Sequence, residues 1–426
     1  MNIKKFKNKS YVIILIIFLL FSSISIADDY VEEYTEYVFE PLDISEMNFQ
    51  LLSRHIAVYE RNSNTFLFEK SSKEKCAMAS TTKIMTCILI LENCDLNENT
   101  TISQKSASTG GSRLGLTANS TISVKDLLYG LMLCSGNDCA VALAEYCSGS
   151  VEDFSTLMNS KAQSLGLSST HFVTPHGLDN ENHYSTAHDF ALLTDYALKN
   201  PQFVQIVGTK KYTVSLNGSS KSITNTNELL GSIPSVYGVK TGYTSQAGRC
   251  LITSSKQDDL DIIVVVFGAD TKSIRTNDSA NLINYMHSTY TTINLKNLVT
   301  EKYNDYITHI VPYIKIDKIS DHINPQIENN YTSCFVIRKD NIDKINVSLI
   351  DYPLKAPVYK NDIIATIKVY NDNKELLRVN ITAQSDLKVK SALDYLKYFF
   401  INYKLLFIAW KHHSHICASE YLRIKF

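Results

Sequence analysis

The chain has 426 residues, and its 42 Lys and Arg residues nearly balance its 43 Asp and Glu residues, so the formal net charge is −1. This balance excludes a nucleic-acid-binding class that depends on a strongly basic field, and it excludes acidic disorder. The 44% of hydrophobic residues, with only 15 Gly and 8 Pro, is typical of packed globular domains and excludes low-complexity and collagen-like chains. At roughly 100 to 200 residues per domain, the length suggests two or three domains.

The N-terminus has the three-part layout of a secretory signal peptide. Lys4, Lys5, Lys7 and Lys9 precede an uncharged run over residues 10–26, and small residues stand before Asp28. The alternative is an uncleaved anchor, but the strongly apolar part is shorter than the ~20 residues that span a bilayer. We therefore predict a signal peptide over residues 1–27, cleavage after Ala27, and a mature protein that works outside the cytoplasmic membrane.

The next elements follow from hydrophobic periodicity. Residues 54–69 alternate around Asn62, Ser63 and Asn64, which predicts a β-hairpin. Helices are predicted over residues 81–93, 124–134 and 139–147, and a further helix from Val151, with Ser150 and Asp153 as a capping pair. Strands are predicted within residues 236–268 and a helix over residues 276–290.

The composition changes after about residue 292. Short strand-like runs follow at residues 306–316, 333–339, 345–350, 363–370 and 375–383, which indicates a separate small β domain. From Leu393 onward, apolar residues recur at steps of 3 and 4 beside a stripe of three lysines: Lys397, Lys404 and Lys411. This pattern predicts an amphipathic helix that lies in a membrane interface with its lysines toward anionic headgroups. The alternative is a helix packed on its own domain.

The cysteines and histidines give weaker signals. The nine cysteines are odd in number and lack paired CxxC spacing, so we interpret most of them as small buried hydrophobic residues, with a catalytic thiol as the weaker alternative. Four histidine and acidic residues fall close together and could suggest a metal site, but a structural role is favoured: His176, Asp179, His183 and Asp189. We therefore predict no metal site and no cofactor.

The candidate nucleophile is Ser80, in Ser80-Thr81-Thr82-Lys83. On a helix, residues i and i+3 share one face, so the lysine amine could take the serine proton if its pKa is lowered by burial or by a nearby cation. This pattern alone is weak, because roughly two such matches are expected by chance in a chain of this length. Ser80 stands out because it opens a predicted buried helix, where the helix dipole favours a developing anion.

Two further motifs strengthen this interpretation. Ser135-Gly136-Asn137 lies between two predicted helices, and Lys240-Thr241-Gly242 lies on a predicted strand. Together with Ser-x-x-Lys, in this order, they form the signature of penicillin-recognising serine enzymes.

The chain thereby resembles the low-molecular-mass penicillin-binding proteins, the serine-type D-alanyl-D-alanine carboxypeptidases. The resemblance extends through MASTTKIMT, HGLD and GVKTGYTSQAGRCL, and Thr174 stands where the family usually has Asn. It implies an α+β fold: a serine β-lactamase/penicillin-binding-protein-like domain with an antiparallel sheet and helices, a small β-sandwich domain and a C-terminal amphipathic helix. The expected boundaries are 28–292 for the catalytic domain, 293–390 for the β-sandwich, 391–413 for the helix and 414–426 for a tail.

Carried over to this sequence, the resemblance implies four catalytic residues. Ser80 would attack the carbonyl between the two terminal D-alanines, and Lys83 would be the general base. Ser135 would relay the proton to the leaving amine, and Asn137 would hydrogen-bond the substrate amide. The expected substrate is the peptidoglycan stem pentapeptide, and β-lactam antibiotics would acylate the same serine.

The resemblance also implies the substrate-binding residues. Lys240 and Thr241 would hold the terminal carboxylate, Arg275 would assist them, and Gly242 would leave the strand edge open. The backbone N–H groups of Ser80 and Tyr243 would form the oxyanion hole, and a peptide along the strand edge would gain main-chain hydrogen bonds. Lys240 would also supply a positive charge that keeps Lys83 partly neutral.

Three alternatives stay open at this point. A β-lactamase shares the three motifs, but the second motif is SGN rather than SDN, and no Glu-x-x-Leu-Asn supplies a deacylating base. A D,D-endopeptidase would use the same acyl-enzyme. A non-catalytic wall-binding protein would not be expected to keep Ser80, Lys83 and Lys240 intact.

Overall fold

The computed structural model describes Phe39, Leu42 and residues 47–216, 218–310, 323–354, 357–387 and 393. The predicted signal peptide, the C-terminal amphipathic helix beyond Leu393 and the tail lie outside the described residues. Within the described part of the chain, no helix is both long and apolar enough to cross a membrane.

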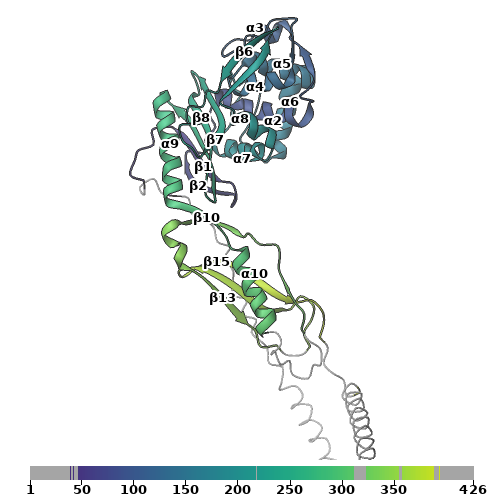
Figure 1. The fold of residues 1–426 in the computed structure, drawn as a ribbon, viewed down its shortest axis with the longest axis vertical. Coiled ribbons are helices and arrows are strands. Elements are labelled where there is room, and N and C mark those ends of the chain that lie inside the picture. Colours follow the sequence, from purple (N-terminus) through teal and green to yellow (C-terminus); the bar gives the residue numbers. More distant parts are fainter. Residues whose placement is uncertain are drawn as a thin grey trace, which may run out of the picture. The chain divides into compact units, whose positions relative to one another are not determined.

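A five-stranded antiparallel sheet organises the first part of the chain (Figure 1). Its strand order is β2-β1-β9-β8-β7, so β7 is an edge strand. The strands are β1 (His55–Glu60), β2 (Thr65–Lys70), β7 (Val236–Thr244), β8 (Gly248–Gln257) and β9 (Leu260–Ala269). The predicted hairpin is confirmed: β1 and β2 pair around a turn in which Asn64 has a positive φ of 54°.

Both faces of this sheet are covered. Since successive residues of a strand point to opposite faces, each strand contributes side chains to two cores. Ala57, Val265 and Phe267 belong to the core that packs on the helices, and Val58 and Val264 belong to the core under α9 (Lys272–Thr289). The helices of the first core are α2 (Lys83–Asn93), α3 (Gln104–Ser108), α4 (Val124–Met132), α5 (Asn137–Ser148), α6 (Val151–Ser164), α7 (Ala187–Leu198) and α8 (Pro201–Val207). The predicted helices are therefore present, and the Ser150 side chain accepts from Asp153 N as expected for a cap.

Two small hairpins complete this part. The pair β3 (Asn99–Thr101) and β4 (Thr121–Ser123) brackets the loop that leads to α4. The pair β5 (Lys211–Leu216) and β6 (Ser219–Thr224) was not predicted, because its alternating residues are mostly polar. Tyr212 anchors it: the ring stacks on Tyr129 with 3.6 Å between ring centroids, and the hydroxyl donates to Asp126.

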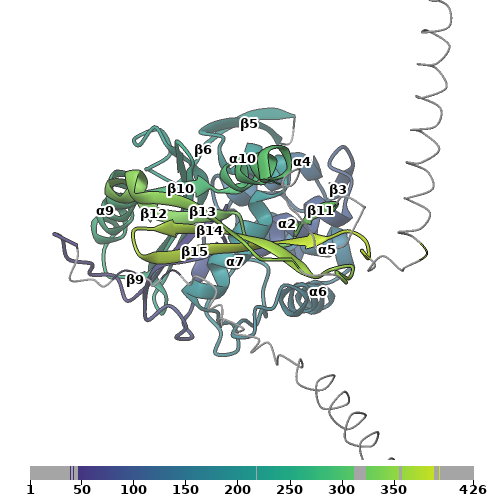
Figure 2. The same ribbon diagram turned by 90° about the horizontal axis from the view of Figure 1, so that it is seen from below.

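The described residues after 289 form two further sheets and a helix. The strand β10 (Tyr290–Asn294) pairs with β12 (Cys334–Arg338), and a four-stranded sheet has the order β11-β15-β14-β13. Its strands are β11 (Pro325–Ile327), β13 (Ile345–Asp351), β14 (Ile363–Asn371) and β15 (Lys374–Ala383). Helix α10 (Lys296–Asp305) contacts β13 and β14 (Figure 2), and a turn of 3-10 helix, η5 (Lys339–Lys344), follows β12.

The predicted strand at residues 306–316 is wrong in its first part, because Tyr306–Ile310 is a π-helix that continues α10. The β-branched residues suggested a strand. The decisive pattern is instead the helical spacing of Val299, Tyr303 and Tyr306, which pack on the core of this part of the chain, with Tyr306 fully buried.

Candidate active site

The three motifs meet at one pocket of about 580 Å³. The pocket is lined by residues from all three motifs, among them Ser80, Ser135, Thr241, Gly242 and Tyr243, and by Arg275. Lys83, Asn137 and Lys240 do not line the pocket, because their side chains are buried beside it. The structure therefore brings together segments that are more than 100 residues apart in the sequence.

Ser80 sits in a turn of 3-10 helix, η2 (Ala79–Thr82), and Lys83 is the first residue of α2. The prediction that Ser80 itself opens the long helix is therefore wrong by one turn, although the two side chains do share a face. Lys83 Nζ lies 2.8 Å from Ser80 Oγ. The residue before the serine, Ala79, has a positive φ of 48°, a conformation that costs energy for a residue with a Cβ atom and is often stored at functional sites.

Lys83 is completely buried, and three oxygens surround its amine. Besides Ser80 Oγ, these are Asn137 Oδ1 at 2.7 Å and the His176 carbonyl at 2.8 Å. Burial holds the pKa of Lys83 well below its usual range, and the charge of Lys240 lowers that pKa further. When Lys83 is neutral, its two N–H groups can serve Asn137 and His176, which leaves its lone pair directed at the Ser80 hydroxyl.

The second motif supplies a strained turn and a helix start. Ser135 has a positive φ of 62° and lines the pocket, and Asn137 begins α5. The Asn137 amide is fixed at both ends, because its Oδ1 accepts from Lys83 and its Nδ2 donates to the Gly110 carbonyl at 2.7 Å. A Cβ atom on Gly111 would lie 2.5 Å from Asn137 Nδ2, so a glycine is required there.

Asp138 is a site residue that the sequence analysis missed. Its carboxylate is buried and accepts four backbone N–H groups, those of Leu114, Gly115, Leu116 and Cys139, at 2.7 to 3.1 Å. The same loop carries Ser112, whose carbonyl accepts from Asn137 N at 2.7 Å. Asp138 therefore holds one wall of the pocket, and no spacing rule in the sequence connects it to residues 114–116.

The third motif lies on β7, the edge strand. Lys240 Nζ donates to the Thr241 carbonyl at 3.0 Å, and Thr241 Oγ1 shares a 2.6 Å hydrogen bond with Thr226 Oγ1. Burial lowers the pKa of Lys240 to about 7, with a further contribution from the charge of Arg275. Tyr243 is 54% exposed, and its ring lies under the Arg249 guanidinium.

Gly242 has a steric role beyond leaving the strand edge open. A Cβ atom there would meet Ala79 Cβ at 3.0 Å, Ser80 N at 3.1 Å and the Met78 carbonyl at 3.2 Å. The absence of a side chain thus lets β7 approach the turn that carries Ser80.

Arg275 lines the pocket from α9 and is nearly fully buried. Its Nη2 donates to Glu228 Oε2 at 3.0 Å, and Lys272 also pairs with Glu228 at 2.5 Å. Burial lowers the pKa of Arg275 from its usual value, although Glu228 opposes that shift. Its Nε is buried and has no hydrogen-bond partner among the described residues.

A family pattern described as D-alanyl-D-alanine carboxypeptidase matches residues 43–271, more than half of the chain. The chain belongs to the D-alanyl-D-alanine carboxypeptidase family. A second pattern, described as the C-terminal domain of penicillin-binding protein 5, matches residues 330–389. The predicted family and the α+β fold with its C-terminal domain are thus confirmed, whereas the predicted C-terminal helix stays a prediction.

Individual proteins and solved structures of this family are similar to the chain over most of its length or over about half of it. The chain is 32% identical over 352 residues to D-alanyl-D-alanine carboxypeptidase DacF of Bacillus subtilis, covering 81% of this chain and 88% of that protein. Among solved structures, penicillin-binding protein 5 of Haemophilus influenzae has a TM-score of 0.64 at 26% identity and covers 80% of this chain and 99% of that one. The Streptomyces K15 DD-transpeptidase has a TM-score of 0.54 at 31% identity, covering 56% of this chain and 97% of that one.

The histidines near the carboxypeptidase pocket have structural partners. His183 Nε2 lies 2.9 Å from Thr82 Oγ1, and its Nδ1 accepts from Val173 N at 2.9 Å. Burial lowers the pKa of His183 to about 4 and that of His176 to about 3, so both rings are neutral at pH 7. Among the described residues, no three His, Cys, Asp or Glu side chains converge as a metal site would require.

The cysteines fit the sequence interpretation in part. The eight cysteines in the described residues are free; Cys87, Cys139 and Cys250 are buried, and the others are partly buried. Burial raises the pKa of the Cys250 thiol to about 12, which keeps it protonated and unreactive.

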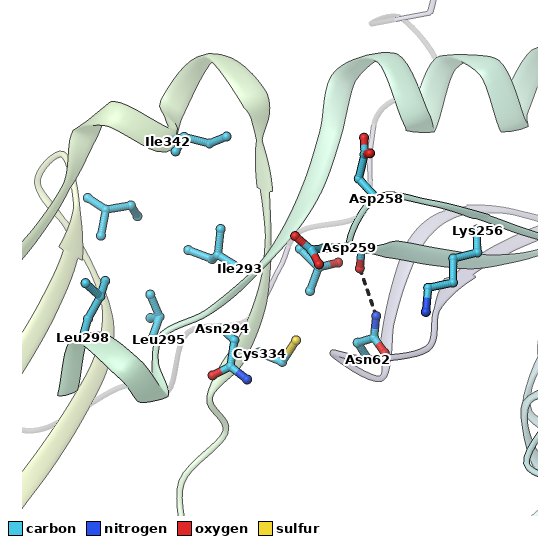
Figure 3. A pocket seen from close by; sticks show the side chains of 12 residues that line it. Asn62, Lys256, Asp258, Asp259, Ile293, Asn294, Leu295, Leu298, Cys334 and Ile342 are labelled. Atoms are coloured by element: carbon cyan, nitrogen blue, oxygen red, sulfur yellow. Dashed lines mark hydrogen bonds between the residues drawn. The ribbon is translucent and has the colours of Figure 1, made fainter. Parts of the chain in front are cut away.

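A larger pocket, of about 870 Å³, contains none of the motif residues (Figure 3). Asp258 and Asp259, from the turn after β8, contribute to its lining, as do the apolar side chains of Ile293 and Leu298. The Asn62 amide donates to the Asp259 carbonyl at 3.0 Å, which fixes the turn between β1 and β2 beside this pocket (Figure 3).

Proposed function

We propose that the chain removes the terminal D-alanine from peptidoglycan stem pentapeptides through an acyl-enzyme on Ser80. The observation that carries this mechanism is the 2.8 Å contact between Ser80 Oγ and the amine of fully buried Lys83. Neutral Lys83 takes the hydroxyl proton while Oγ bonds to the carbonyl carbon of the penultimate D-alanine. The C–N bond then breaks, and the departing amine receives a proton through Ser135. Water hydrolyses the remaining ester and regenerates Ser80.

The substrate carboxylate is bound by the third motif in this proposal. Lys240, Thr241 and Arg275 hold the terminal carboxylate, and the Asn137 amide donates its second N–H, the one not bonded to the Gly110 carbonyl, to the substrate amide. The backbone N–H groups of Ser80 and Tyr243 stabilise the oxyanion, since donors fixed in advance lower the cost of charge development. The free edge of β7 offers main-chain hydrogen bonds to an extended peptide.

Related reactions would use the same acyl-enzyme. Transfer to an amine instead of water is the second candidate, because one similar structure is described as a DD-transpeptidase. A D,D-endopeptidase would differ only in the leaving amine. β-Lactams acylate Ser80 in each case, and no metal or organic cofactor enters the proposed mechanism.

The test uses the mature chain and a muramyl pentapeptide. We expect loss of one D-alanine, measured as free D-alanine and as product mass, and its abolition by Ser80→Ala with an unchanged circular dichroism spectrum. Fluorescent penicillin should label the wild type and not the variant. Label on Ser80→Ala would place the nucleophile elsewhere, whereas acylation without D-alanine release would favour the transfer or endopeptidase reaction. Rapid turnover of the penicillin would indicate a β-lactamase.

We also propose that the protein works on the outer face of the cytoplasmic membrane. Residues 1–27 export it, residues 28–292 form the catalytic domain, residues 293–390 form a β-sandwich domain, and the helix at 391–413 binds the membrane surface. The lysine stripe of that helix and the cell-wall substrate support this arrangement.

Deletion of residues 391–426 tests the anchor. The truncated mature protein should move from the membrane fraction to the soluble fraction, because it loses the apolar face and the lysines that attract anionic headgroups. Penicillin label after cell fractionation reports the distribution and also shows that the catalytic domain is folded. Continued sedimentation of the labelled protein with membranes would contradict the anchoring role.

A further inference from the structure

The pocket holds more positive charge than one substrate carboxylate requires. Lys240, Arg249, Lys272 and Arg275 contribute cations to the pocket or lie beside it. Glu228 is the one carboxylate residue of the lining, and it is engaged by Lys272 at 2.5 Å and Arg275 at 3.0 Å. In the proposed mechanism the terminal carboxylate is bound at Lys240 and Arg275, so the charge of Arg249 stays unmatched.

Arg249 has no salt bridge to a carboxylate among the described residues. Two acidic residues come near this strand end: Asp270 follows Ala269, the residue of β9 that is paired with Arg249, and Asp179 contacts the β7–β8 turn. Each has another partner. Asp270 pairs with Arg54, and Asp179 accepts from Gln246 N at 3.4 Å. The guanidinium instead lies over the ring of Tyr243, with 3.7 Å between Cζ and the ring centroid. This stacking holds Arg249 in place, and its guanidinium N–H groups have no hydrogen-bond partner among the described residues, so they can donate to a planar acceptor.

The strand register places Arg249 relative to the proposed substrate. Tyr243 of β7 is paired directly with Arg249 of β8, so the two side chains share a face of the sheet. Thr241 lies two residues before Tyr243 and shares that face as well. Along a strand, two residues correspond to about 7 Å. Along the strand direction, Arg249 is therefore displaced by about this distance from Thr241.

An extended peptide along the β7 edge has the same repeat. With its terminal carboxylate at Thr241 and its scissile carbonyl at Ser80, the residue two positions before the terminus comes level with Tyr243. In the proposed substrate this is the residue that precedes the two D-alanines. We infer that Arg249, held by Tyr243, binds a carboxylate in the side chain of that residue, so that the enzyme selects peptides whose third residue carries a free acid.

This inference rests on the proposed function and makes Arg249 a specificity-determining residue. A bidentate guanidinium–carboxylate pair has a geometry that an amide or an ammonium group cannot satisfy equally. The preferred third residue thus has a side chain that ends in a free carboxylate, rather than in an amide or an ammonium group.

Three pentapeptides test the inference: one with meso-diaminopimelate at the third position, one with its side-chain carboxyl amidated, and one with lysine. Wild-type kcat/KM for D-alanine release should be about tenfold higher for the free acid than for the other two, the factor expected for one charge-assisted hydrogen bond. Arg249→Gln should lose that preference while keeping kcat/KM for the amidated and lysine peptides within about twofold. A wild type without preference for the free acid would overturn the inference.

The matched control is Lys256→Gln, which removes a positive charge from the same strand at a position outside this pocket. It should retain the preference for the free acid. A uniform loss on all three peptides with Arg249→Gln would also overturn the inference, because it would assign Arg249 to the terminal carboxylate or to the fold.

A second readout separates this inference from the proposed function. Carbenicillin carries a side-chain carboxylate that benzylpenicillin lacks, and acylation by either compound requires no peptidase activity. The ratio of the acylation rate with carbenicillin to the rate with benzylpenicillin should be lower for Arg249→Gln than for the wild type. Lys256→Gln should not change this ratio. If no peptide releases D-alanine, the carboxypeptidase proposal fails, and the unchanged or lowered carbenicillin ratio still decides the role of Arg249.

Discussion

Replacing Lys83 with Gln should lower the rate of penicillin acylation by about 10²- to 10⁴-fold, the range typical of a lost general base. Gln can still donate to one of the two oxygens that hold the buried amine, Asn137 Oδ1 and the His176 carbonyl, so the fold should be kept. It has no lone pair basic enough to take the Ser80 proton. Stopped-flow acylation with a fluorescent penicillin measures the rate, and circular dichroism checks the fold. A loss smaller than tenfold would assign the base to another group.

The pH dependence gives a contrast to this variant. Acylation needs neutral Lys83, so its rate falls as the pH drops through the lowered pKa of Lys83. Since the charge of Lys240 contributes to that lowering, Lys240→Gln should raise the pKa of Lys83 and move the acid limb to higher pH. The midpoint of the limb is the decisive quantity, because Lys240→Gln also weakens carboxylate binding. If the midpoint did not move, burial alone would account for the lowered pKa of Lys83.

Gly177→Ala should abolish acylation although Gly177 touches no substrate in the proposed mechanism. Its φ is +85°, and an added Cβ would lie 1.9 Å from the Ala79 carbonyl oxygen and 2.5 Å from its carbon. Relief requires movement of the backbone directly before Ser80. We expect a loss of at least about 2 kcal/mol of stability from the positive φ and the overlap combined, which lowers Tm by about 5 °C or more.

Gly166→Ala is the matched control for this substitution. Its φ of +72° is equally unfavourable for alanine, but no atom lies within 4 Å of the added Cβ. This variant should lose about 1 kcal/mol of stability and keep the full rate of acylation. Equal acylation rates in the two variants would show that the contact between Gly177 and Ala79 does not position the nucleophile.

The parts of the site that are local in sequence could be predicted. Ser80 and Lys83 are three residues apart, and such a spacing places both groups on one face in a 3-10 turn as well as in an α-helix. The strands β8 and β9 could also be predicted, because a long apolar run such as residues 260–269 is compatible with few other structures in a globular protein. In these segments the local preference and the tertiary contacts agree.

The rest depends on contacts that no spacing encodes. The positive φ of Ala79 is imposed by its neighbours, and the residue type alanine does not predict that conformation. The loop at residues 114–116 is held by Asp138 through backbone N–H groups, which leave no trace in the side chains of the loop. Arg249 looks like any surface arginine until the register with Tyr243 is known. Such residues are found only when both partners are seen.

The close approach of β7 to the Ser80 turn also limits how this target could escape antibiotics. A larger side chain beside the nucleophile is one way for an enzyme to exclude a β-lactam. At Gly242, however, the first added carbon would already press on Ala79 and on the backbone of Ser80. A side chain there would displace the turn that carries Ser80 by a few tenths of an ångström and so disturb substrate acylation as well as acylation by the drug, and we expect point mutations that confer resistance to arise farther from the serine, on the pocket wall formed by Thr226.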